Sequence, residues 1–235
     1  MADRNKIYEK KARLYPVIIA MLIPMILFII LGTHICSLFN NFHYIWNVLI
    51  SIIPAGLITG TLSYSLKSIA RSTSKKIFQF PLFKEDETYM PSTNYLLYST
   101  NYMSAQKKQL IREKIKQKIG LDLLNEEQER QNEREARLLI VDAVAQIRER
   151  TRGNEILFNY VCYFGFIRNF LGANVWSFLI TLIFMIYNFY DSIVSNTISI
   201  GAVLLVLSLF GIFYALLKQS GREYARQLYI AFIEI

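Results

Sequence analysis

The chain has 235 residues, of which 53% are hydrophobic, and a net charge of +8. It contains 10 glycines, 5 prolines and 2 cysteines, which excludes the low-complexity, collagen-like and disulfide-rich classes. Charged residues are unevenly placed, because none occurs at positions 14–66 and only Asp191 occurs at positions 169–217. Each uncharged block is more than twice the ~20 apolar residues that cross a bilayer once. The composition therefore indicates a membrane protein rather than a soluble domain.

Each uncharged block predicts a pair of transmembrane helices. The first block divides at the polar stretch GTHICSLFNNFHY and gives spans 14–31 and 45–64. The second divides at DSIVSNT and gives spans 175–190 and 197–217. A cleaved signal peptide is the alternative for the first span, but the run is longer than a signal core and no A-x-A-like site follows it. We therefore expect an all-α membrane protein with four transmembrane helices.

The basic residues predict the orientation of these spans. Five precede the first span, 18 lie between the second and third, and three follow the fourth. The positive-inside rule then places both termini and the middle segment in the cytoplasm. The expected location of the spans is the inner (plasma) membrane. The expected organisation is an N-terminal tail and hairpin over 1–66, an inserted cytoplasmic helical domain over 67–174, and a second hairpin with a cytoplasmic tail over 175–235. Cys36 near the outer face and Cys162 inside cannot form a disulfide within one subunit.

The middle segment begins without a clear pattern and then becomes helical. Residues 67–91 lack periodicity and contain two prolines, so they predict a connector with one short extended piece. The stretch PSTNYLLYS has N-cap residues for a short helix. Residues 104–119 predict a longer helix with Ser104 as N-cap, because isoleucines recur at every fourth position and Gly120 supplies the stop.

The following helix is expected over residues 125–152. Asn125 and Gln128 form a capping-box-like pair at its start. Its first turns contain no apolar residue, whereas its second half has an apolar face made by Ala136, Ile140, Val144 and Ile147. The second half is therefore expected to pack, and the first half to be solvated or to contact another subunit. Residues 155–172 predict a juxtamembrane helix that leads into the third span after Gly172.

The helix over 104–119 carries six cations and a single acid. Lys108, Arg112 and Lys116 follow one another at i, i+4 and i+8, with Lys107 on a neighbouring face and the isoleucines facing inward. Because like charges repel, an anion is expected close by. Lipid headgroups, worth ~1 kcal/mol per basic residue, and a polyanionic ligand are both candidates. Guanidinium groups suited to phosphate would complete a ligand site, namely those of Arg148, Arg150, Arg152 and Arg168.

The second span contains an uncharged stripe of small residues at intervals of four: Ser51, Ala55, Thr59 and Ser63. Such a stripe permits close helix packing, and it can also line a water-filled pore once several copies surround an axis. Both interpretations stay open. One subunit has too few spans for a pore of its own, so a channel requires a homo-oligomer, for which we expect a tetramer.

Several kinds of chemistry have no signal in the chain. It contains no G-x-G-x-x-G, Walker loop, H-E-x-x-H or G-x-S-x-G motif, so an enzyme is not expected. The spacing of His34, Cys36 and His43 matches no usual metal pattern, and no metal or other cofactor is expected. No Asp, Glu, Lys, Arg or His lies within a predicted span, which argues against a proton-coupled transporter.

Residues 149–174, ERTRGNEILFNYVCYFGFIRNFLGAN, combine T-R, then F, then Y-x-G-F-x-R-N-x-x-G. This stretch and the four-pass layout resemble Hailong-type effector channels of bacterial anti-phage defence operons. The resemblance implies a multimeric ion channel that is held or gated by a nucleic-acid product of a partner nucleotidyltransferase. The alternative function is a non-conducting membrane anchor or sensor that recruits a cytoplasmic partner through residues 125–152.

Overall fold

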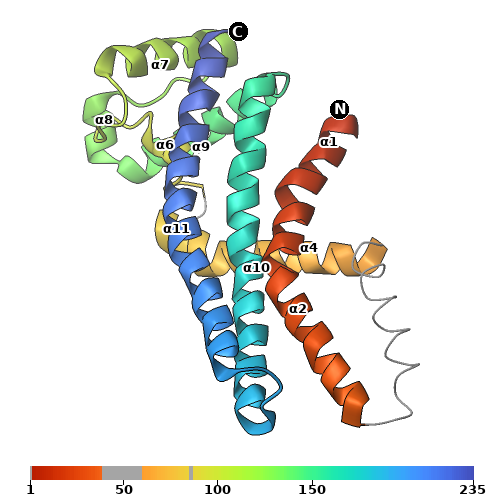
Figure 1. The fold of residues 1–235 in the computed structure, drawn as a ribbon. Helices are drawn as coiled ribbons and strands as arrows, with labels where there is room; N and C mark the ends of the chain where they lie inside the picture. Colours follow the sequence, from red (N-terminus) through yellow and green to blue (C-terminus); the bar gives the residue numbers. More distant parts are fainter. Residues whose placement is uncertain (1, 39–59, 85–86) are drawn as a thin grey trace. The chain divides into compact units, whose positions relative to one another are not determined.

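The computed structural model describes residues 2–38, 60–84 and 87–235. Within these ranges every regular element is a helix, and Figure 1 shows their course. In chain order they are α1 (Ala2–Tyr8), η1 (Glu9–Leu14), α2 (Tyr15–Leu38), α4 (Gly60–Ser74), η2 (Lys75–Gln79), α5 (Phe80–Phe83), α6 (Pro91–Asn94), α7 (Ala105–Ile119), α8 (Glu126–Gln131), α9 (Glu133–Arg150), α10 (Glu155–Asp191) and α11 (Asn196–Ile233). The segments η1 and η2 are π-helical.

The chain forms two compact units. Unit 1 contains the described residues of Met1–Phe78 and Gly165–Leu216, and unit 2 contains those of Gln79–Phe164 and Leu217–Ile235. Both α10 and α11 are continuous from one unit into the other. The domain border expected after residue 174 therefore falls inside a helix. The C-terminal residues, expected as a tail, belong to unit 2.

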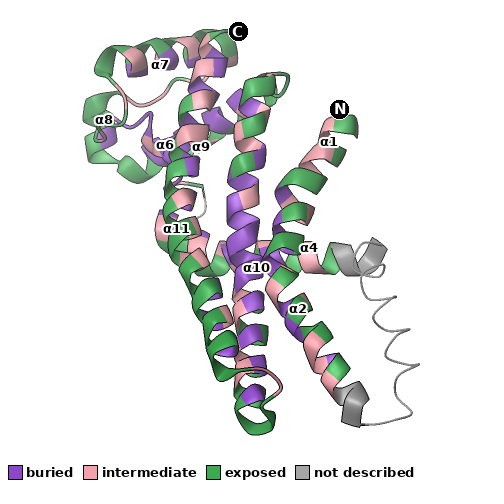
Figure 2. Cartoon of the chain, in the orientation of Figure 1, coloured by how far each residue is buried: buried purple, intermediate pink, exposed green. Residues whose placement is uncertain are grey.

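Three helical stretches are long and apolar enough to cross a membrane: Asp3–His34, Glu155–Asp191 and Asn196–Ile233. The first, third and fourth expected spans fall within them. Figure 2 shows that much of the outer surface of these helices is exposed. That surface includes large apolar side chains such as Ile26, Ile183 and Leu204. Lipid or another subunit would have to cover an apolar surface of this kind.

The second expected span, 45–64, is mostly outside the described residues. Its last part, residues 60–64, forms the beginning of α4. The segment after it was expected to be a connector with an extended piece, and this prediction was wrong, since the chain stays helical through η2 and α5 to Phe83.

Within unit 1, α4 packs closely on α10. Figure 1 shows α4 running across α2 and α10. At the crossing, a Cβ atom on Gly172 would lie 1.8 Å from the carbonyl oxygen of Ala70. Only glycine allows the two backbones to approach this closely. Gly172, after which the juxtamembrane helix was expected to lead into the third span, is an internal residue of α10.

The N-terminal helix is tied to α10 by a buried side-chain hydrogen bond. Asn169 Nδ2 donates to the carbonyl oxygen of Ala12 at 2.6 Å. Ala12 belongs to the π-helical η1, whose C-terminal neighbour Tyr15 donates its N–H to the carbonyl oxygen of Lys10, five residues earlier. A side chain of α10 thus binds the backbone of the N-terminal helix.

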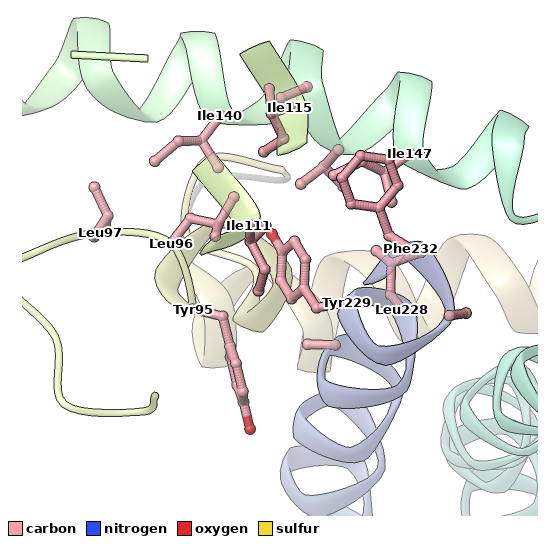
Figure 3. Close-up of a cluster of buried hydrophobic side chains, with 14 of the residues drawn as sticks. Tyr95, Leu96, Leu97, Ile111, Ile115, Ile140, Ile147, Leu228, Tyr229 and Phe232 are labelled. Carbon is pink, nitrogen blue, oxygen red and sulfur yellow. The ribbon is translucent and has the colours of Figure 1, made fainter. Parts of the chain in front are cut away.

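Unit 2 is built around an apolar core, drawn in Figure 3. Ile111 and Ile115 of α7 are fully buried there, as the isoleucine spacing predicted, and so is Ile147 of α9. The C-terminal end of α11 contributes Tyr229 and Phe232 to the same core. The C-terminal end of α11 is therefore part of the core of unit 2.

The capping signals of unit 2 are largely confirmed. Residues 105–119 form α7, which ends on Gly120 with φ at +78°. Asn125 and Gln128 form the predicted capping box. The single helix expected over 125–152 is instead two, because the side chain of Asn132 accepts a hydrogen bond from Glu135 N and begins α9 anew.

Candidate functional site

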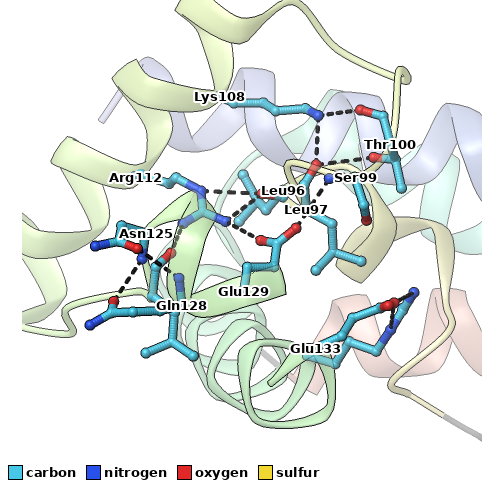
Figure 4. Close-up of polar contacts among 12 residues, drawn as sticks. Leu96, Leu97, Ser99, Thr100, Lys108, Arg112, Asn125, Gln128, Glu129 and Glu133 are labelled. Atoms are coloured by element: carbon cyan, nitrogen blue, oxygen red, sulfur yellow. Dashed lines mark hydrogen bonds and ion pairs between the residues drawn. The ribbon is translucent and has the colours of Figure 1, made fainter. Parts of the chain in front are cut away.

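Lys108, at the start of the predicted cationic stripe, faces the interior of unit 2 (Figure 4). Only 4% of its surface is exposed. Its Nζ donates to the carbonyl oxygen of Leu97 at 2.6 Å and to that of Thr100. Both acceptors belong to the irregular segment that follows α6, so Lys108 fastens this segment to α7.

Arg112, one turn later, is also used inside the unit. Its guanidinium donates to the carbonyl oxygens of Leu96 at 2.8 Å and Leu124 at 2.6 Å. It forms an ion pair with Glu129 at 3.1 Å and lies 4.0 Å from the ring centre of Tyr98. Arg112 thereby joins three parts of the chain that are far apart in sequence.

Glu129 is the internal anion of this cluster, and sequence analysis did not identify it. Only 2% of the surface of Glu129 is exposed. The carboxylate oxygen that does not pair with Arg112 accepts a hydrogen bond from Ser99 N at 3.1 Å. Burial lowers the pKa of the nearby Lys108, although the Glu129 carboxylate opposes that shift. The signal for Glu129 was weak, because it is one acid among several in a polar stretch.

Two of the remaining cations of α7 also have partners within unit 2. Lys114 Nζ donates to the carbonyl oxygen of Ile233 at 2.5 Å, and the exposed Lys116 pairs with Asp122 at 2.7 Å. Lys107 lines a pocket of about 440 Å³ together with Leu110 and residues from the end of α11. The prediction that the stripe faces outward is therefore wrong for Lys108 and Arg112. Their charges are balanced by the protein itself.

Two of the predicted arginines do meet at a pocket. Arg148, in the last turn of α9, and Arg152, in the turn that follows α9, line a cavity of about 410 Å³ in unit 2. Arg148 lies 3.6 Å from Glu87, and Arg152 pairs with Glu149 at 2.6 Å. The Nε of Arg148 is buried and has no hydrogen-bond partner among the described residues. Aromatic side chains also line this cavity, those of Phe158 and Tyr224.

The other two predicted arginines are not part of this cavity lining. Arg150 is exposed on α9. Arg168 belongs to unit 1, where 9% of its surface is exposed. The Arg148 pocket, defined by Arg148, Arg152, Glu87, Phe158 and Tyr224, is thus the part of the predicted ligand site that the structure assembles.

The predicted pore stripe remains a prediction. Ser51, Ala55 and Thr59 lie outside the described residues, and Ser63 lies in α4 without a described side chain. The described spans contain a different set of polar residues, which sequence analysis did not single out. They are almost fully buried: Asn174, Ser177, Thr181, Asn188 and Ser199.

Two of these buried polar residues, Asn174 and Asn188, join α10 to the residues of α11 and of the loop before it. Asn174 Nδ2 donates to the carbonyl oxygen of Val206 at 3.1 Å. Asn188 Nδ2 donates to the carbonyl oxygen of Val194 and to Asn196 Oδ1, at 3.0 and 2.9 Å. Their spacing along one face of α10 was the signal that would have revealed them.

Near the C-terminal end of α2, His34 Nε2 lies 3.1 Å from Oδ2 of Asp191, the last residue of α10. Within the part of the chain that the structure describes, no three His, Cys, Asp or Glu side chains are placed to hold a metal ion.

Comparison of the chain with protein-family models, with curated proteins and with solved structures gives no match.

Proposed function

We propose that the chain forms a homo-oligomeric membrane channel whose permeation is controlled through unit 2. The observation that carries this proposal is the continuity of α10 and α11, which have 37 and 38 residues and belong to both units. Each helix is about 55 Å long, nearly twice the ~30 Å core of a bilayer. Because both helices are continuous, a conformational change in unit 2 can be transmitted along them into the membrane.

The proposed topology has four spans, with both termini and unit 2 in the cytoplasm. From its first residue to Leu38, α2 extends over about 36 Å, enough to cross the membrane. Lys67 of α4 nevertheless lies 3.4 Å from Glu9, before the start of α2. The chain has thus returned to the side of the N-terminus by α4, which supports a second crossing after α2.

A pore would form between copies of the chain. In one chain, the polar residues of α10 and α11 are buried against each other, while apolar side chains cover the outer surfaces of these helices. Oligomerisation is therefore part of the proposal, with a tetramer as the expected size. The stripe Ser51, Ala55, Thr59 and Ser63 remains the candidate lining.

The Arg148 pocket is the proposed ligand site. A buried guanidinium N–H without a partner favours binding of an oxygen acceptor such as a phosphate. Phe158 and Tyr224 would suit the base of a nucleotide. Following the resemblance above, the ligand would be a nucleotide or oligonucleotide made by a partner nucleotidyltransferase, in bacterial anti-phage defence.

Conductance in a planar bilayer tests the proposal. Purified protein should produce discrete current steps, and short oligonucleotides or cyclic nucleotides should change their open probability. The Arg148→Gln/Arg152→Gln variant should conduct but lose the response to the ligand. The matched variant Lys116→Gln/Lys118→Gln removes two exposed cations of α7 and should respond normally. Wild-type protein that assembles in the bilayer and never conducts would refute the channel.

Cysteine labelling tests the topology separately. In a background of Cys36→Ser and Cys162→Ser, a membrane-impermeant thiol reagent should label Ser195→Cys in intact cells and should not label Lys118→Cys. Labelling of both positions only after lysis, or of Lys118→Cys from outside, would contradict the four-span arrangement.

One observation favours the alternative function, a non-conducting anchor that recruits a partner. α8 exposes Glu126, Glu127 and Arg130 to solvent, and the Glu126–Arg130 ion pair is on the surface. A mixed-charge helix of this kind is able to dock another protein. Capture of a defined cytoplasmic partner by a protein without conductance would support this alternative.

A further inference from the structure

The segment α4–η2 lies at one end of the membrane part of unit 1. Ala70 contacts Gly172, which is about 20 residues from Asp191 at the far end of α10, the number that crosses a bilayer. Phe78 stacks on Phe210 of α11, with ring centres 5.9 Å apart. α4–η2 therefore contacts α10 and α11 roughly one bilayer thickness from their loop.

Two contacts show which edge of α4 faces the membrane. Trp176 Nε1, farther along α10 toward the loop, donates to Thr73 Oγ1 at 3.1 Å. Lys67, on a different edge, pairs with Glu9 in the N-terminal helix. Ile69 follows helical spacing with Thr73, whereas Arg71 follows it with Lys67. The apolar edge of α4 thus lies on the side of Trp176, toward the loop between α10 and α11, and the basic edge lies toward the N-terminal helix.

The apolar edge is more exposed than the inside of a protein would be. Ile69 is 44% exposed, Ile77 in η2 is 49% exposed, and Trp176 beside them is 42% exposed. A helix with such an edge and a basic opposite edge is typical of segments that lie in the headgroup layer of a membrane. Trp is also enriched at that depth.

Almost all the net charge of the protein is found in unit 1. This unit has ten lysines and arginines and three acids, whereas unit 2 has 16 and 15. One of the three acids, Asp191, lies at the opposite end of the spans. The ten cations are Arg4, Lys6, Lys10, Lys11, Arg13, Lys67, Arg71, Lys75, Lys76 and Arg168. The positive charge is therefore concentrated at the level of α4 and the N-terminal helix.

We infer that α4–η2 and the N-terminal helix form a binding surface for anionic phospholipid headgroups, with Ile69 and Ile77 at the boundary of the acyl chains. Arg71, Lys75 and Lys76 supply the positive charge closest to that edge. The inference rests on the proposed orientation, which assigns this surface to the cytoplasmic leaflet, and does not require that the protein conducts.

Trp176 provides a direct probe of the lipid at this surface. In a Trp46→Phe background it is the single tryptophan, and bromine atoms on lipid acyl chains quench an indole on contact. The protein is reconstituted into vesicles that contain phosphatidylglycerol and phosphatidylcholine, with only one of the two brominated. The ratio of quenching by the two lipids, corrected for their proportions, measures how strongly the anionic lipid is enriched beside α4.

The expected ratio favours phosphatidylglycerol about fivefold or more and decreases with added salt. The Arg71→Gln/Lys75→Gln/Lys76→Gln variant should approach a ratio of one. The matched variant Lys116→Gln/Lys118→Gln/Arg150→Gln, which removes three exposed cations of unit 2, should keep the wild-type ratio. Trp176 emission in fully brominated vesicles shows whether each variant remains inserted.

A wild-type ratio near one would overturn the inference, as would equal ratios for wild type and the α4–η2 variant. If inorganic phosphate abolishes the enrichment and sodium chloride of equal ionic strength does not, the site binds free phosphate and the lipid assignment is wrong. Conductance is recorded on the same vesicle preparation. Enrichment without conductance would refute the proposed channel and leave the lipid surface intact.

Discussion

The contact between α4 and α10 gives the sharpest test of the fold. In Gly172→Ala, the new Cβ would lie 1.8 Å from the carbonyl oxygen of Ala70, and real Cβ atoms do not come closer than 3.0 Å. The carbonyl must therefore move by at least about 1.2 Å. The clashing atom is part of the backbone of α4, so a change of rotamer cannot relieve the overlap.

Forced overpacking of this kind costs about 1–3 kcal/mol, and a shift of a helix backbone should be near the upper end. For a chain of this length, a loss of about 3 kcal/mol corresponds to a melting temperature lower by about 6–12 °C. The loss of helical circular dichroism on heating in detergent measures this change. Gly201→Ala is the matched control, because nothing lies within 4 Å of its Cβ, and it should be neutral or slightly stabilising.

A second glycine separates a backbone clash from a side-chain clash. In Gly165→Ala the new Cβ would lie 2.9 Å from the Cβ of Ala12 and 3.0 Å from the hydroxyl of Tyr8. Ala12→Gly should therefore rescue Gly165→Ala, whereas Ala70→Gly should not rescue Gly172→Ala. A Gly172→Ala protein that melts like wild type would refute the close approach of α4 and α10.

Two further predictions concern buried hydrogen bonds. Lys108→Met should destabilise the protein by about 1–3 kcal/mol, because two carbonyl groups lose their donor, while exposed Lys118→Met should be neutral. Burial lowers the pKa of Lys108 in the folded protein, so the unfolded chain binds this proton more tightly. The free energy of unfolding of wild type, relative to that of Lys108→Met, should therefore rise with pH up to the ordinary lysine pKa of 10.5. A difference that does not change with pH in denaturant titrations would contradict this. Asn169→Leu should cost about 1–3 kcal/mol through the lost bond to the carbonyl oxygen of Ala12, and a variant as stable as wild type in denaturant titrations would argue against that role of Asn169.

The features that could be predicted from sequence are those that local chemistry determines. The repeat that includes Ile111 and Ile115 defines the buried face of α7, and Gly120 ends that helix. Asn125 and Gln128 are close enough in sequence to form a capping box without help from other residues. Of the four spans that the uncharged blocks predicted, three fall within helices that are long and apolar enough to cross a membrane.

The features that were missed depend on contacts between distant segments. Lys108 and Arg112 turn inward because backbone carbonyls and Glu129 accept their hydrogen bonds, and backbone carbonyls leave no pattern in a sequence. Similarly, α4 has many Ser and Thr residues, which are weak helix formers. Its backbone packs closely on α10 at Gly172, and a contact between distant segments of this kind leaves no pattern in a sequence.

The continuity of α10 and α11 also limits how the length of this chain can vary in evolution. Asn174 of α10 donates a hydrogen bond to Val206 of α11 in unit 1, and the rings of Phe164 and Tyr224 stack in unit 2, with ring centres 6.2 Å apart. Inserting one residue in either helix between these two contacts rotates everything beyond it by about 100° and advances it by 1.5 Å. An insertion in one helix alone would therefore break one of the two contacts. Related chains should carry insertions and deletions in this stretch in both helices at once, in blocks of about seven or eleven residues that restore the helical phase.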